Sequence, residues 1–77
     1  MIAVLAPTHS SYRRYLSENG LTPNKAIHVR DCYHLKGLSR GTVLVKIDGW
    51  QRGFSAEDRD WIDTMIQVYN FSVVFVG

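Results

Sequence analysis

Polar residues that can bind phosphate follow the first apolar run of the chain. This run, residues 2–6, ends in a proline and is followed by Thr8, His9, Ser10 and Ser11. At the start of a helix, their hydroxyls and backbone N–H groups can hold a phosphate. The segment has no glycine, which close-fitting phosphate loops normally use, and the chain has neither a Walker A pattern nor a dinucleotide fingerprint. Plain helix capping is the alternative for these residues, and both interpretations stay open.

A second candidate segment, Asp48–Gly53, follows the apolar run at residues 42–47. Its Trp50 lies on a turn flanked by glycines, where an exposed indole can stack on a base or fill a partner's pocket. Arg52 can contact a phosphate or a carboxylate. The alternative is that Trp50 folds back onto the core while Asp48 caps the turn.

Residue types that bind zinc also occur, as His28, Cys32 and His34. A structural zinc site needs four ligands, and only His9 or Asp31 could complete this set. The spacing matches no zinc finger, so we expect no metal. A serine nucleophile would need a histidine oriented onto it, but His9 and the serine after it are chain neighbours, which seldom face each other. The sequence therefore predicts no catalytic residue and no cofactor.

These segments need a scaffold, which the apolar periodicity of the chain predicts. Short apolar runs indicate four strands, at residues 2–6, 26–29, 42–47 and 71–76. Helical spacing lies between them, with Ser55 as N-cap of the longest helix and Asp31 as cap of a short one. This alternation favours a parallel sheet with right-handed crossovers. We expect a single α/β domain over residues 1–77, a Rossmann-like or flavodoxin-like half with strand order 2-1-3-4 and two to three helices.

This topology places the carboxyl ends of strands 1 and 3 beside a switch point, where open α/β sheets bind their ligands. The segments Thr8–Ser11 and Asp48–Arg52 would meet there. Arg30 and Asp31, which follow strand 2, would border them. We therefore expect a site at this edge of the sheet.

The same topology leaves one face of strands 3 and 4 uncovered, because only the first helix lies on that side. The set expected on this open face is Leu44, Lys46, Ser72, Val74 and Val76. The set expected under the last helix is Val43, Val45, Ile47, Phe71, Val73 and Phe75. Strand 4 is also a free edge without proline or charge, which invites pairing with another chain. These features predict self-association or a protein partner.

Composition narrows the class of protein. The lone Cys32, in a chain that shows no signal peptide, fits a reducing cytoplasm. No apolar run is long enough to cross a membrane. Residues 1–46 hold seven basic and two acidic residues, whereas residues 47–77 hold two basic and five acidic ones. Aromatic and basic side chains mix in Tyr12–Tyr15, so nucleic-acid binding is a further alternative, although a net charge of +2 is low for that class.

The layout of the chain resembles small proteins encoded by actinobacterial phages. The similar features are an opening strand that ends in Ala6-Pro7, a middle stretch Leu35–Leu38 and a strand at Thr42–Ile47. Proteins of this kind mostly have no assigned function. The resemblance implies a protein that binds a host protein in the host cytoplasm.

A local similarity is to nucleoside deoxyribosyltransferase-like domains. Ile47–Trp50 followed by Ser55–Glu57 resembles their Pro-Gly-Trp…Ser…Gly-Ala…Glu segment, with Asp48 in place of the proline. The resemblance implies a flavodoxin-like sheet and places Glu57 at the position of the family's nucleophile.

Two main functional hypotheses result. The first is a non-enzymatic protein that binds a host protein and also pairs with itself, through Trp50, Arg52, Leu44, Val74 and Val76. The second is a reduced nucleotide- or nucleoside-binding domain, with the ligand near Thr8, His9, Ser10, Ser11, Asp48 and Glu57.

Overall fold

The four apolar runs form one parallel sheet in a computed structural model that describes residues 1–38 and 41–77. The strands are β1 (Ile2–Leu5), β2 (Ala26–His28), β3 (Val43–Ile47) and β4 (Ser72–Val76). Their order is β2-β1-β3-β4, and every neighbouring pair is parallel. The predicted α/β class and strand order are therefore confirmed, and a Rossmann-like half describes the arrangement.

The helices begin at the predicted caps. Helix α1 (His9–Glu18) starts after Thr8, and α2 (Ala56–Tyr69) starts after Ser55, whose hydroxyl accepts a hydrogen bond from the Asp58 N–H. The short helix expected after Asp31 is a 3₁₀ helix, η1 (Cys32–Gly37). A second 3₁₀ turn, η2 (Trp50–Gly53), follows β3. None of the helices in residues 1–38 and 41–77 is long and apolar enough to cross a membrane.

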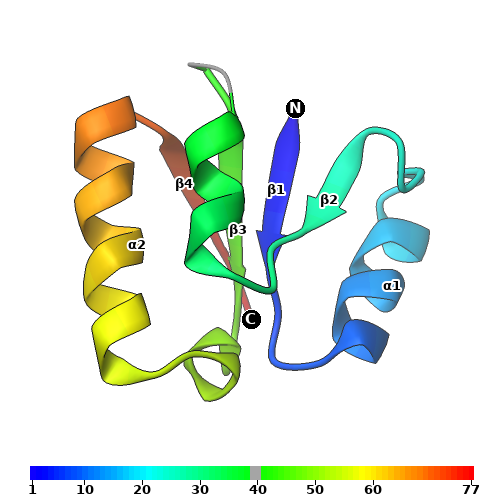
Figure 1. Ribbon diagram of the computed structural model, residues 1–77. Coiled ribbons are helices and arrows are strands. Elements are labelled where there is room, and N and C mark those ends of the chain that lie inside the picture. Colours follow the sequence, from blue (N-terminus) through cyan, green and yellow to red (C-terminus); the bar gives the residue numbers. More distant parts are fainter. Residues whose placement is uncertain (39–40) are drawn as a thin grey trace.

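The helices cover opposite faces of the sheet, as expected for right-handed crossovers. Figure 1 shows α1 on one side, and α2 with η1 on the other. Two apolar clusters result. The cluster on the α2 side contains buried Ala3, Leu5, Val29, Leu35, Leu44, Trp50, Ile62, Met65 and Phe71. The cluster on the α1 side contains buried Val4, Ala6, Tyr12, Leu16, Ala26 and Val45.

The prediction for the two faces of β3 is wrong. Leu44 was expected on the open face, but it packs in the α2 cluster with 0% of its surface exposed. Val45, expected under α2, packs in the α1 cluster instead. Both alternating sets of β3 are apolar enough to be buried, so alternation alone cannot orient this strand. Leu44 therefore offers no surface to a partner.

Lys46 explains how the less apolar set can face α2. Its Nζ lies 3.5 Å from Oδ1 of Asp63 on α2. The same ammonium lies 4.8 Å from the ring centre of Trp50 and 5.6 Å from that of Phe75. A buried charge is tolerated when it is paired, and aromatic faces attract a cation. The carboxylate and the two rings thus satisfy Lys46 under the helix.

The expectation that Trp50 stands exposed on its turn is also wrong. Only 8% of Trp50 is exposed, and its ring lies 6.1 Å from the ring of Phe54. Gly49, with a left-handed φ of 84°, allows the chain to turn back into η2 and to direct the indole onto the α2 cluster. Trp50 is thus a core residue and drops out as a partner contact, while Arg52 stays exposed.

Candidate functional site

A large hollow lies beside α1 and β2. Its volume is about 750 Å³, and its wall has a basic part and an apolar part, Leu16, Leu21 and Pro23, which we call the apolar floor. It is lined by His9, Tyr12, Arg13, Leu16, Ser17, Leu21, Pro23, His28, Arg30 and His34. None of these lining residues is acidic. The cavity is therefore an electropositive site with an apolar floor.

A second hollow, of about 320 Å³, lies at the carboxyl ends of β1 and β2 and shares three residues with the first. The shared residues are His9, His28 and Arg30. Thr8 and Phe54 line the second hollow but not the first. We call His9, His28, Arg30 and His34 the basic cluster, because three of its members form the wall common to both hollows and His34 lines the larger one.

The sheet and α1 position the basic cluster. His28 is the last residue of β2 and pairs in register with Val4 of β1. The N–H of Val29 donates to the carbonyl of Val4 at 2.9 Å, so the chain stays beside β1 past the end of the strand. Arg30, two residues after His28, returns to the same face. His9 is the first residue of α1 and follows the last residue of β1, Leu5, by four positions.

The hydrogen bonds within the cluster define its donors. Nη2 of Arg30 lies 3.0 Å from Nδ1 of His9, and the Arg30 backbone N–H donates to Nδ1 of His34 at 3.3 Å. Arginine and a backbone N–H are donors only, so both of these Nδ1 atoms accept. His28 Nδ1 also lies 3.2 Å from His9 Nδ1, but the single lone pair of His9 Nδ1 already faces Arg30, so this pair is a close approach with no donor assigned. Neutral His9 and His34 consequently carry their proton on Nε2.

Ring stacking holds His28 in place. Its ring lies 4.8 Å from the ring of Tyr12, with 14° between the planes, and 5.4 Å from the ring of His9. The Tyr12 hydroxyl donates a 2.6 Å hydrogen bond to the carbonyl of Ala26, which ties α1 to the outer edge of β2. Stacking on a hydrogen-bonded tyrosine restricts the imidazole to one orientation.

The surroundings of His28 favour its neutral form. Burial lowers the pKa of His28 below 6.5, and the positive charge of Arg30 and the neighbouring His9 lower this pKa further. The carbonyl of Ala6 acts in the opposite direction by accepting a hydrogen bond. A negative charge brought into the cluster would offset the repulsion that keeps the proton off His28.

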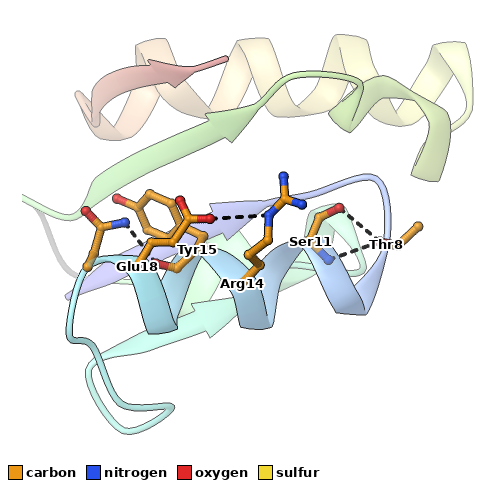
Figure 2. Close-up of polar contacts among 6 residues, drawn as sticks. Thr8, Ser11, Arg14, Tyr15 and Glu18 are labelled. Atoms are coloured by element: carbon orange, nitrogen blue, oxygen red, sulfur yellow. Dashed lines mark hydrogen bonds and ion pairs between the residues drawn. The ribbon is translucent and has the colours of Figure 1, made fainter.

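The predicted ligand residues are only partly brought together. His9 belongs to the basic cluster, and Thr8 lines the smaller hollow. Thr8 acts mainly as a helix cap, because its hydroxyl accepts from the Ser11 N–H at 3.1 Å and lies 3.0 Å from the Ser11 hydroxyl (Figure 2). Ser10 is exposed and lines neither hollow. The capping interpretation therefore accounts for Thr8 and Ser11.

Asp48 and Glu57 lie outside the basic cluster. Asp48 lines a separate hollow of about 220 Å³ with Ser11 and Arg14. The side chain of Arg14 is ion-paired with Glu18 at 3.3 Å along α1 (Figure 2). Glu57 is exposed in the first turn of α2. The described structure thus does not assemble the predicted set of Thr8, Ser10, Asp48 and Glu57 around one cavity.

The sequence contained a signal for the basic cluster that the structure brings together. His28 ends strand 2 and Arg30 and His34 follow it, and alternation alone puts His28 and Arg30 on one face. Their proximity to His9 depends on β1 and β2 being neighbours, which the strand order already predicted. In the part of the chain that the structure describes, no three His, Cys, Asp or Glu residues group as a metal site would. The side chain of Cys32 lies outside the described part.

Comparison with known proteins finds no matching family, no matching curated protein and no matching solved structure. The two resemblances drawn from the sequence therefore stay predictions.

Proposed function

We propose that this protein binds a small phosphate-bearing ligand, such as a nucleotide, in the cavity beside α1 and β2. The observation that carries the proposal is the donor pattern of the basic cluster. Arg30 occupies the acceptor nitrogens of His9 and His34, so the remaining side-chain nitrogens of these three residues are N–H donors. A site that offers donors and positive charge without a carboxylate in its wall selects a ligand that only accepts, which is an oxyanion.

The cavity also supports a ligand larger than a free ion. Its volume of about 750 Å³ lies within the range of roughly 300–1,000 Å³ that small-molecule pockets occupy. Leu16, Leu21 and Pro23 line it together with the basic residues. An apolar floor beside a basic wall suits an organic phosphate. We propose that the phosphate contacts Arg30 and His9, while the organic part lies on the apolar floor.

A thermal-shift series with inorganic phosphate, AMP and ATP tests the proposal. A ligand present at about 100 times its Kd adds about 2.7 kcal/mol of stability, which raises the Tm of a domain this small by roughly 10 °C or more. Arg30→Gln should weaken binding by roughly 10–100-fold, because a charge-assisted hydrogen bond contributes about 1.5–3 kcal/mol. Lys25→Gln is the matched control, since it removes the same charge from an exposed residue that does not line this cavity.

A pH series separates binding by the basic cluster from general charge attraction. An anion near His28 favours the imidazolium, so binding takes up a proton and tightens as the pH falls from about 8 to about 6. Sulfate is the suitable probe, because its own charge is constant over this range. His28→Gln should flatten the pH dependence. No shift with any of these anions, or equal weakening by Arg30→Gln and Lys25→Gln, would rule the site out.

Docking of another protein is the second candidate function. It is supported by the exposure of Val74 and Phe75 on the outer strand β4. Arg52, in the turn after β3, is also exposed. A host protein as partner, with the protein acting in the host cytoplasm, follows from the resemblance to phage proteins. A pull-down in which Phe75→Thr removes a partner that Lys25→Gln retains would support this function.

A further inference from the structure

The outer edge of β4 carries unused strand-pairing groups. The Asp48 N–H of the chain after β3 donates to the carbonyl of Val76 at 2.8 Å, so Val76 directs its backbone groups toward β3. Along a strand, the side to which the backbone N–H and C=O groups point alternates from residue to residue. Val74, two residues before Val76 and in register with Val45, therefore also directs these groups toward β3. The N–H and C=O groups of Val73 and Phe75 then point away from the sheet. Among the described residues no strand lies on that side.

At the opposite edge of the sheet, the outward backbone groups of β2 have hydrogen-bond partners within the chain, unlike those of β4. On β2, the outward carbonyl of Ala26 accepts from the Tyr12 hydroxyl at 2.6 Å, and the Ala26 N–H donates to the Thr22 carbonyl at 3.2 Å. Chain that precedes β2 and a side chain of α1 therefore occupy that edge. Neither Val73 nor Phe75 makes a comparable contact with another part of residues 1–38 and 41–77.

The composition of β4 also favours pairing. Natural edge strands are protected by charge, proline or a bulge, and Ser72–Val76 contains no charged residue and no proline. Phe75 is 76% exposed and Val74 is 45% exposed, on opposite faces of the strand. The nearby charge of Lys46 faces Asp63 and the aromatic rings rather than the edge. Nothing in the strand repels an identical strand.

We propose that β4 binds β4 of a second copy of this chain, antiparallel, with Val74 on the two-fold axis. In this register Val73 of each copy lies opposite Phe75 of the other. Both are outward-facing residues, so each of these pairs can exchange two N–H···O=C bonds. The two Val74 side chains meet directly across the axis, where side chains approach most closely. One continuous sheet then runs through both copies.

The charges of α2 favour a second copy in this orientation. All charged residues of α2 lie in its first half, Ala56–Asp63, and the half Thr64–Tyr69 has none. Asp63 contacts Lys46, which pairs in register with Phe75, so the charged half lies beside the carboxyl end of β4. The two-fold axis places that end beside the start of the other β4. The acidic half of each helix therefore lies beside the uncharged half of its counterpart.

Side chains complement the backbone pairing. Phe75 would lie across from Val73 of the second copy and diagonal to its Phe71, and both of these pack on the α2 cluster. The most exposed large apolar side chain of the described chain would thus be covered. Two five-residue strands bury less than the about 1,200 Å² of a standard interface, so we expect a dimer that forms at micromolar or higher concentration.

Sedimentation velocity between about 10 μM and 1 mM tests the proposal, and we expect the weight-average mass to approach that of a dimer. Phe75→Pro removes an N–H that faces outward, not one that bonds to β3, so the fold is retained while the pairing is lost. Phe75→Thr keeps that N–H and removes the ring; its dimer should weaken less than that of Phe75→Pro. Val74→Lys should abolish the dimer, because two like charges would meet on the axis.

The outcomes separate cleanly. A mass that stays monomeric at 1 mM would overturn the proposal, and so would a dimer that survives both Phe75→Pro and Val74→Lys. Far-ultraviolet circular dichroism confirms that each variant folds. The phosphate response of Phe75→Pro should match that of the unaltered protein, since Phe75 does not line the cavity beside α1 and β2.

Discussion

The hydrogen bond between the Tyr12 hydroxyl and the Ala26 carbonyl allows a quantitative test of how the candidate site is held. Tyr12→Phe deletes one oxygen and leaves the ring that stacks on His28. Tyr12 is 5% exposed and Ala26 is 0% exposed, so water cannot easily replace the lost donor. The Ala26 carbonyl faces away from β1, because the Ile2 N–H bonds to the carbonyl of Lys25, one residue earlier. The Ala26 carbonyl therefore makes no hydrogen bond to β1.

The expected loss of stability follows from these contacts. A buried hydrogen bond contributes about 1–1.5 kcal/mol, and leaving a buried acceptor without a partner adds part of its desolvation cost. We expect Tyr12→Phe to lower the free energy of unfolding by about 2 kcal/mol. For a domain of this size, that corresponds to a fall in Tm of roughly 8–16 °C.

Urea unfolding followed by circular dichroism measures the loss. Tyr15→Phe is the matched control, because Tyr15 lies on the same helix (Figure 2), is half-buried, and its hydroxyl makes no hydrogen bond to any residue in the described ranges 1–38 and 41–77. Its loss should stay below about 0.5 kcal/mol, as for a substitution that removes no partnered group. If the two variants lose the same small amount of stability, the Tyr12 hydroxyl does not tie α1 to β2, and the ring that stacks on His28 is not held by a hydrogen bond.

Two further predictions concern His28 and Trp50. Burial, Arg30 and His9 lower the pKa of His28 below 6.5, so as the pH falls the unfolded chain takes up a proton at this histidine before the folded chain does. The contribution of His28 to stability should therefore be full above pH 6.5 and be lost as the pH falls below 6.5. Tm measured against pH should show this loss, and the loss should be smaller in His28→Gln. Trp50→Ala should cost about 3–5 kcal/mol in urea unfolding, because it empties a core position. A loss below about 0.5 kcal/mol would mean that Trp50 is a surface residue after all.

The helix ends show how much local sequence can predict. Ser55 and Thr8 cap α2 and α1, since an N-cap hydroxyl needs only the backbone N–H three residues later. Asn70 ends α2 in the left-handed region at a φ of 55°, which asparagine adopts more readily than most residues. These contacts lie within one turn of chain, so tertiary packing was not needed to anticipate them.

The candidate site shows the limit. His28 and His34 are visible in the sequence as possible zinc ligands, yet in the structure they share one wall with Arg30, which bonds to His34 and His9. Whether neighbouring imidazoles face a metal or a guanidinium depends on rotamers and on ångström distances between α1 and β2. Residue spacing carries no such information.

By itself, the sequence determined the four strands, the two longer helices and the parallel strand order, because apolar period, capping residues and the right-handed crossover rule act along the chain or between successive elements. Only the tertiary structure decided that Lys46 is buried against Asp63 and that Trp50 turns into the core. Each of these depends on partners that are far away in sequence or on a turn that could have closed either way. The burial of Lys46 and of Trp50 lowers the free energy of the domain as a whole, because the cost of burying polar groups is offset by partners from other elements. A short stretch of sequence does not contain those partners.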